Sequence, residues 1–125
     1  MYNVIQVSTL GKTWILDIDG TLVKHNGYLI DGHDTLLAGI ETFLTQIKPQ
    51  DMVILLSSRD ESYKKQTESF LKAHHIRYDI VIYNAPYGER ILVNDAKPSG
   101  MKTAIAVNTK RDESTQITFE INEEI

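Results

Sequence analysis

Residues 14–22 read WILDIDGTL, an apolar run that leads into two aspartates separated by one isoleucine. A short continuous apolar run of this kind is typical of a buried strand. Aspartate is depleted in strands, so the presence of both Asp17 and Asp19 at the end of this strand requires a structural or functional explanation. If the two carboxylates lie about 5 Å apart at an effective dielectric near 20, they repel by roughly 3 kcal/mol. A bound Mg²⁺ would offset this repulsion; the alternative is a turn capped by the two aspartates, with Gly20 supplying backbone freedom.

Strand-like and helix-like patterns alternate along the following residues. Apolar runs at 52–56, 80–82, 91–93 and 104–107 predict further buried strands, and helical spacing of apolar residues over 34–48 and 60–74 predicts two helices. The alternation predicts an α/β fold with a Rossmann-like, mostly parallel sheet flanked by helices. Asn26-Gly27 between apolar residues predicts a β-hairpin flap after the first strand.

The length of 125 residues predicts one domain, 1–125, with a core over about 13–108 and terminal strand segments at 2–8 and 115–121. In the second of these segments, apolar and polar residues alternate over 117–121, which is the pattern of a half-exposed strand. We interpret it as an antiparallel edge strand, and residues 4–7 are its candidate partner.

The composition excludes several classes of protein. The absence of cysteine excludes a disulfide scaffold and thiolate chemistry, and it agrees with a reducing cytoplasm. No apolar run approaches the roughly 18 residues that a membrane span needs. The net charge of −4 and the 8% aromatic content argue against a broad nucleic-acid surface. We therefore expect a cytoplasmic protein that binds neither membrane nor nucleic acid.

Polar residues end three of the predicted strands. Asp17 and Asp19 end the first, Ser57 ends the strand over 52–56, and Asp95 closely follows the run over 91–93. Ligands of open parallel sheets bind beyond the carboxyl ends of the strands. We therefore expect these side chains to face one site.

These three stretches resemble, in the same order, motifs of the haloacid dehalogenase (HAD) superfamily of phosphotransferases. DIDGTL at 17–22 resembles the first motif, VILLS at 53–57 the second and LVND at 92–95 the fourth. The resemblance covers about 13–108. The run over 88–100 also resembles small capless members associated with bacterial capsule and surface-polysaccharide sugar pathways.

The resemblance implies Mg²⁺-dependent hydrolysis of a phosphate monoester, here a sugar phosphate, through an aspartyl-phosphate intermediate. Asp17 would be the nucleophile, and Asp19 would be the general acid and base. Ser57 would hold the transferring phosphoryl group through its hydroxyl. The Mg²⁺ site would comprise Asp17, Asp19 and Asp95. The remaining substrate-binding residues implied at these motifs are Gly20, Ser58 and Arg59.

The third motif of the family, a lysine or arginine before the fourth-motif strand, has no match, because residues 83–89 contain no basic side chain. Lys97, just beyond Asp95, is the first candidate for this role, as a catalytic residue. The other candidates are Lys64, Lys65 and Arg90. No second acid follows Asp95 at four or five residues, so Asn94 is a candidate source of a further metal ligand.

Only residues 23–33 separate the first motif from the predicted helix, which leaves no room for a cap domain. The open site would admit a bulky substrate or be closed by formation of a homo-oligomer. Two other functions remain open: a catalytically weak or inactive HAD-like binding or regulatory domain, and a receiver-type domain phosphorylated at Asp60.

Overall fold

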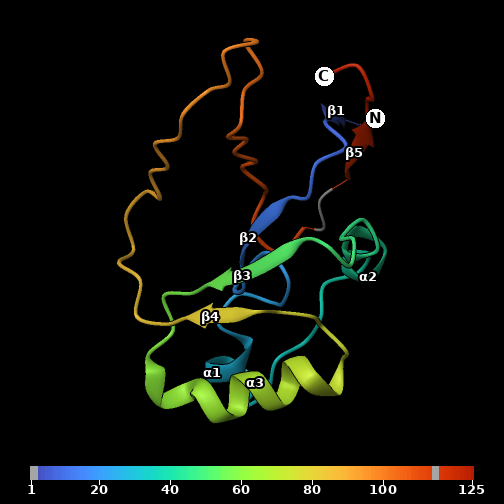
Figure 1. Cartoon of the computed structure of the whole chain (residues 1–125). Helices are drawn as coiled ribbons and strands as arrows, with labels where there is room; N and C mark the ends of the chain where they lie inside the picture. The colour runs from blue at the N-terminus through green and yellow to red at the C-terminus, as the bar shows by residue number, and fades with distance from the viewer. Residues whose placement is uncertain (1–2, 114–115) are drawn as a thin grey trace.

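A three-stranded parallel sheet forms the centre of the protein, which is seen here in a computed structural model that describes residues 3–113 and 116–125. Its strands are β2 (Thr13–Asp17), β3 (Met52–Leu56) and β4 (Ile80–Ile82), in the order β2-β3-β4 (Figure 1). Asp17 lies opposite Leu56, which in turn lies opposite Ile82. The three predicted strands are confirmed, and their carboxyl ends share one edge of the sheet.

The terminal segments form a second sheet, in which β1 (Asn3–Val7) pairs with β5 (Ile117–Ile121). The predicted partnership is confirmed, but the strands are parallel rather than antiparallel. Alternation of apolar and polar residues determines which face is buried and carries no information on strand direction. Gln46 ties this sheet to the preceding part of the chain, because its side chain donates to the Ile117 carbonyl at 3.2 Å and accepts from the Phe119 N–H at 2.7 Å. Residues 2 and 115 of the predicted segments lie outside the described residues.

The predicted helix over 60–74 is confirmed as the 3₁₀ turn η1 (Glu61–Tyr63) followed by α3 (Lys64–Ala73), which is labelled in Figure 1. The Asp60 side chain caps its start by accepting from the Ser62 N–H at 2.9 Å. Thr67 and Leu71 form the buried face of α3.

The helix predicted over 34–48 is much shorter, since α2 covers only Ile40–Leu44. Gly39, with a φ of 85°, has a left-handed conformation that a helix interior excludes. Before it the chain is extended: Val23 and Leu36 form an antiparallel bridge, and the Leu37 N–H donates to the Leu22 carbonyl at 3.0 Å.

The predicted hairpin flap is also wrong, because Asn26-Gly27 begins the short helix α1 (Gly27–Ile30). Asn26 has the left-handed conformation that such a dipeptide favours, with a φ of 55°, but the Ile30 N–H then donates to its carbonyl at 2.9 Å. This turn directs Tyr28 inward onto Tyr63, with ring centroids 4.8 Å apart. The antiparallel pairing is confined to the base of the excursion. We call residues 24–35 the flap.

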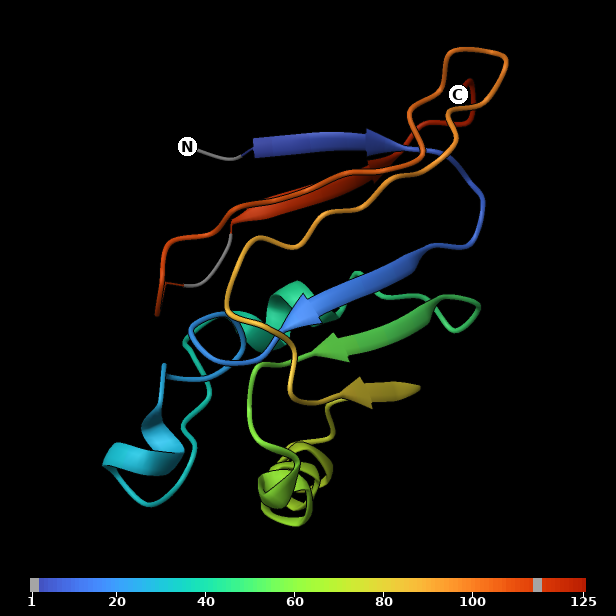
Figure 2. The ribbon, with the colours of Figure 1, turned by 90° about the vertical axis from the view of Figure 1, so that its left-hand side faces the viewer.

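The runs over 91–93 and 104–107 are not strands, which corrects the sequence prediction. They belong to a long excursion, over about 83–110, that leaves β4 and returns toward β5 (Figures 1 and 2). Ile91 is 86% and Val93 90% exposed, and Ile105 of the second run is 47% exposed, so both runs leave exposed much of the apolar surface that would stabilise a central strand. Among the described residues, no strand pairs with the free edge of β2.

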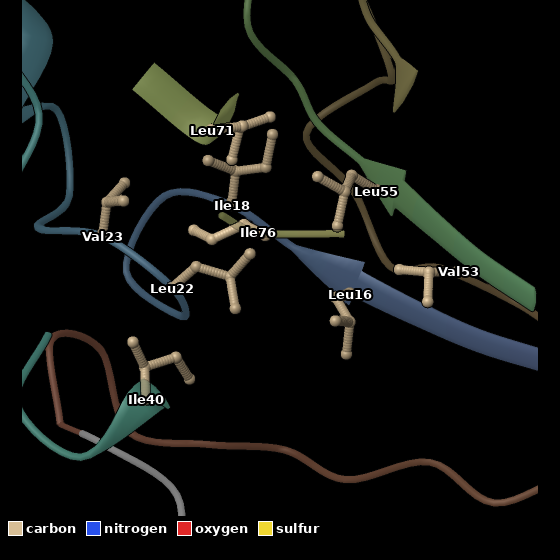
Figure 3. Packing of buried hydrophobic residues seen from close by; sticks show 9 residues of the cluster. All are labelled: Leu16, Ile18, Leu22, Val23, Ile40, Val53, Leu55, Leu71 and Ile76. Carbon is tan, nitrogen blue, oxygen red and sulfur yellow. The ribbon is translucent and has the colours of Figure 1, made fainter. Parts of the chain in front are cut away.

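The core lies between the sheet, α3 and the loop after β2 (Figure 3). Removing one aliphatic side chain of this size from water contributes about 1.5–3 kcal/mol. The loop after β2 is therefore anchored by its own apolar residues, which alternate with the acidic ones. The buried cluster comprises Leu16, Ile18, Leu22, Val23, Ile40, Val53, Leu55, Leu71 and Ile76.

Candidate functional site

The loop after β2 positions the acidic pair. Ile18 is 1% exposed, and its carbonyl accepts from the N–H groups of residues 21, 22 and 23 at 3.3, 2.9 and 3.2 Å. Gly20 has a φ of 81°, and a Cβ there would lie 3.2 Å from the Arg111 side chain, so this tight turn favours glycine. With Ile18 held in the core, Asp17 and Asp19 on either side of it remain accessible at the edge of the sheet.

Asp17 is the more accessible carboxylate, with 36% of its side chain exposed. Its Oδ2 accepts from the Thr21 hydroxyl at 3.0 Å, and its Oδ1 accepts from the Arg90 guanidinium at 3.1 Å. The structure thus brings Arg90 to Asp17, whereas the sequence favoured Lys97. The backbone N–H of Lys97 closes a turn onto Met101 in the long excursion.

Lys64 and Lys65, the other predicted cations, are exposed at the start of α3. Neither makes an ion pair with the acidic loop in the described part of the chain. The geometry therefore favours Arg90 over both lysines as the cation of this site.

Asp19 is held by Arg59, whose side chain is only 1% exposed. Nε and Nη2 donate to the two oxygens of Asp19 at 2.9 and 3.0 Å. Nη1 and Nη2 donate to Asp34 at 3.0 and 2.6 Å, and Nη1 also donates to the Thr67 hydroxyl at 3.0 Å. These five bonds use all the N–H donors of a guanidinium. Arg59, predicted to bind substrate, therefore has its donors occupied by protein side chains.

Burial alone would lower the pKa of Arg59, but the hydrogen bonds to Asp34 and Asp19 raise it above its ordinary value. The Tyr28 ring covers the guanidinium, with Cζ 3.9 Å from the ring centroid. Burial, together with the charge of Asp19, raises the pKa of Tyr28. Arg59 is consequently a permanent cation shared by two carboxylates and an aromatic ring.

Ser57 lies at the same edge of the sheet, directly after β3, and is fully buried. Its hydroxyl accepts from the Arg59 N–H at 3.0 Å, and its backbone bonds to residues 82 and 85. Ser58 is half-buried and donates to the Pro86 carbonyl at 3.4 Å. In this conformation Ser57 therefore organises the turn, and Ser58 is the more accessible of the two hydroxyls.

The predicted metal ligands are not gathered. Asp95 is exposed in the long excursion, where Thr103 bonds to its backbone carbonyl and to the Asn94 side chain. Within residues 3–113 and 116–125, no group of three His, Cys, Asp or Glu side chains could hold a metal ion. Asp17 and Asp19 are instead paired with arginines. The residues as they lie do not fit Mg²⁺, and the predicted dependence on this ion rests on the resemblance alone.

Sequence reasoning missed the segment around Arg111. The Asp112 N–H donates to the Gly20 carbonyl at 2.9 Å, and Asp112 Oδ1 accepts from the His25 N–H at 2.7 Å. These bonds hold the turn that carries exposed Arg111 against the acidic loop. Nothing in the local pattern of residues 110–113 signals this long-range contact. Tyr28 and Asp34 were missed for the same reason.

Comparisons with solved structures give two related matches. A chain of the Pnkp1/Rnl/Hen1 complex is 32% identical with a TM-score of 0.52, over 68% of this protein and 32% of that chain. A chain of the Pnkp1/Rnl/Hen1 RNA repair complex is 34% identical with a TM-score of 0.51, over 69% and 30% respectively. This protein thus spans about a third of the length of the chains that it matches. No protein-family model and no curated protein matches it.

The protein has an α/β fold with parallel sheets and few helices, compatible with a Rossmann-like arrangement. None of the helices in the described residues is long and apolar enough to cross a membrane.

Proposed function

We propose that this protein is a HAD-like phosphatase that hydrolyses a phosphate monoester, with Asp17 as the phosphoryl acceptor and Asp19 as the proton donor and acceptor. The observation that carries the proposal is the contrast between the two carboxylates. Asp17 is accessible and faces the cation Arg90, whereas Asp19 is clamped by Arg59. Adjacent carboxylates in different environments can take different chemical roles.

In the first step, an Asp17 oxygen attacks phosphorus, and the bond from phosphorus to the ester oxygen breaks. Asp19 gives its proton to the departing oxygen, which leaves as an alcohol. In the second step, Asp19 takes a proton from water, and the water oxygen attacks the aspartyl phosphate. Inorganic phosphate leaves, and Asp17 is again a free carboxylate.

Arg90 takes the charge-neutralising role that the sequence assigned first to Lys97. Its guanidinium already lies 3.1 Å from Asp17 and is 37% exposed, so it can reach an incoming phosphate as well. Arginine matches phosphate oxygens with two parallel N–H donors, and phosphoryl transfer depends mainly on such positioning and neutralisation. Ser57 and Ser58 remain the predicted hydroxyl donors to the phosphoryl group.

Mg²⁺ remains part of the proposal because the acidic motif resembles that of a magnesium-dependent family. The steps above describe what the residues of the chain do, and a bound ion would add neutralisation of charge at the phosphoryl group. Turnover measured with added Mg²⁺ and with a chelator tests this part separately from the role of Asp17.

A sugar phosphate is the first candidate substrate, because the run over 88–100 resembles capless members of sugar pathways. The second candidate is a phosphorylated RNA end, which the similarity to a chain of an RNA repair complex favours. Such an end is a phosphorylated ribose followed by further phosphates. Exposed Arg111 beside Gly20 is placed to contact one of them.

The same similarity favours a protein that works in a complex with other proteins, and a homo-oligomer is the simplest alternative. A location in the cytoplasm remains our prediction. In the described part of the chain no third carboxylate joins Asp17 and Asp19 in a metal site, which favours one other function, a HAD-like domain that binds a phosphorylated ligand without cleaving it.

A phosphate-release assay separates these possibilities. The panel contains p-nitrophenyl phosphate, hexose phosphates, and RNA oligonucleotides phosphorylated at the 3′ or the 5′ end. We expect turnover that Asp17→Asn abolishes, and Asp60→Asn is the matched control that should retain it. Binding without release of phosphate across the panel would overturn the phosphatase and support the non-catalytic domain.

A further inference from the structure

The flap is connected to the acidic pair through one buried cation. Tyr28 and Asp34 both belong to the flap, and both contact the Arg59 guanidinium. Arg59 in turn holds both oxygens of Asp19. The chain from flap to Asp19 thus consists of side chains in direct contact, and the bonds between Arg59 and Asp34 are buried.

We propose that Arg59 is a positioning residue, which couples the flap, through Asp34 and Tyr28, to proton transfer by Asp19; this inference rests on the proposed function. It changes the role of Arg59 from the substrate binding that the sequence predicted. It also assigns functions to Asp34 and Tyr28, which no motif indicated.

The geometry leaves Asp19 able to carry a proton. A carboxylate has about four lone-pair sites, and Arg59 uses one on each oxygen. One site per oxygen remains for a proton, and the two parallel bonds set the plane in which that proton is presented. The Asp19 side chain is 16% exposed, so part of it stays accessible to solvent. Bidentate pairing with arginine provides this kind of orientation.

Asp34 determines how strongly Arg59 acts on Asp19. One guanidinium serves two carboxylates, so its positive charge is divided between them. If Asp34 is replaced, Arg59 loses the charged acceptor of two of its five hydrogen bonds, and the plane in which it holds the Asp19 carboxylate is no longer fixed from the flap. A leaving oxygen that needs a proton would then depart more slowly.

The shape of the network makes the flap its adjustable part. Arg59 follows β3 and contacts Thr67 in α3, both of which belong to the core of the fold. Tyr28 and Asp34 lie in the flap, which is joined to the core by the Val23–Leu36 bridge. A substrate that contacts the flap can therefore change the contacts of Arg59, and through them the orientation of Asp19.

The test compares two substrates that differ in their need for a proton. The p-nitrophenolate leaving group departs unaided, whereas the alkoxide of glycerol phosphate requires the general acid. We expect Asp34→Asn to lower kcat on glycerol phosphate by about tenfold or more, within the range of general acid catalysis. On p-nitrophenyl phosphate the same variant should lose less than about threefold, since that step bypasses the acid.

Tyr28→Leu is the second variant, in case Asp34→Asn fails to fold, and should give the same dependence on the leaving group. Asp31→Asn is the matched control, since it removes an exposed ion pair with Lys24 on the same flap and has no contact with Arg59. It should change neither rate. Equal losses on both substrates in folded Asp34→Asn and Tyr28→Leu would overturn the coupling, even while the wild type remains a phosphatase. A wild type with no turnover on either substrate would instead overturn the proposed function and this inference with it.

Discussion

Replacement of Arg59 by methionine, a side chain of comparable length without charge, tests how far the network stabilises the fold. The substitution removes five hydrogen bonds and leaves the carboxylates of Asp19 and Asp34 without their cation. Their side chains are 16% and 2% exposed, so water replaces little of the lost interaction.

Removing one partner from a buried ion pair costs about 3–5 kcal/mol, because an uncompensated charge stays behind. A domain of this length has a total free energy of unfolding of roughly 6–19 kcal/mol. The expected loss is therefore a large fraction of the whole. It corresponds to a fall in Tm of about 12–20 °C at roughly 4 °C per kcal/mol.

Thermal unfolding followed by circular dichroism measures this loss at pH 7, and a second variant identifies its cause. Adding Asp34→Asn to Arg59→Met removes one of the two buried carboxylates that have no cation in Arg59→Met. The double variant should therefore recover a substantial part of the decrease in Tm. Lys24→Met, which removes a cation of the exposed pair with Asp31, should leave Tm almost unchanged. A fall of less than about 5 °C for Arg59→Met, or no recovery in the double variant, would refute the reasoning.

Three further predictions concern other groups. Asp51→Asn should lower the free energy of unfolding by about 1–3 kcal/mol at pH 7, because Asp51 accepts from the backbone N–H of Lys12 and from the Trp14 indole, at 2.9 Å each. Burial opposes ionisation of Asp51, but these hydrogen bonds lower its pKa overall. The difference in free energy of unfolding between wild type and Asp51→Asn, measured by urea unfolding at several pH values, should therefore shrink below about pH 4. A difference that stays constant with pH would contradict this. Burial and the Glu68 carboxylate raise the pKa of Tyr83, so Glu68→Gln should move its alkaline absorbance titration to lower pH. Turnover should stop on chelation and return with Mg²⁺, and unchanged turnover in chelator would remove the ion from the proposal.

The parts of the fold that follow from local pattern were predictable from the sequence. β2, β3, β4 and α3 each coincide with a predicted apolar pattern, although four apolar residues of the strands are 42–50% exposed rather than buried: Ile15, Met52, Ile80 and Ile82. The runs over 91–93 and 104–107 have the same local pattern but no partner strand, because pairing depends on distant residues. Gly39 and Asn26 were visible as turn residues, but their sequence did not show that one would shorten a helix and the other begin one.

The residues of the candidate site likewise divide into those that local pattern predicts and those that depend on distant contacts. Asp17, Asp19 and Ser57 were predictable because strand ends and acidic pairs are local features. The burial of Arg59 was not, since it depends on Asp34 and Thr67, which lie 25 and 8 residues away along the chain. Arg90 reaches Asp17 across 73 residues of separation. An arginine side chain is long enough to contact residues that are distant in the sequence, so local motifs do not predict such contacts.

Trapping the phosphorylated protein tests the proposed chemistry itself. The protein is mixed with radiolabelled phosphate ester, quenched in acid and digested with trypsin, and the labelled peptide is identified. We predict a label that hydroxylamine releases, on the peptide over 13–24, which is absent in Asp17→Asn and retained in Asp60→Asn. Label on the peptide that begins at Asp60, or steady release of phosphate with no labelled protein at any time, would contradict the account.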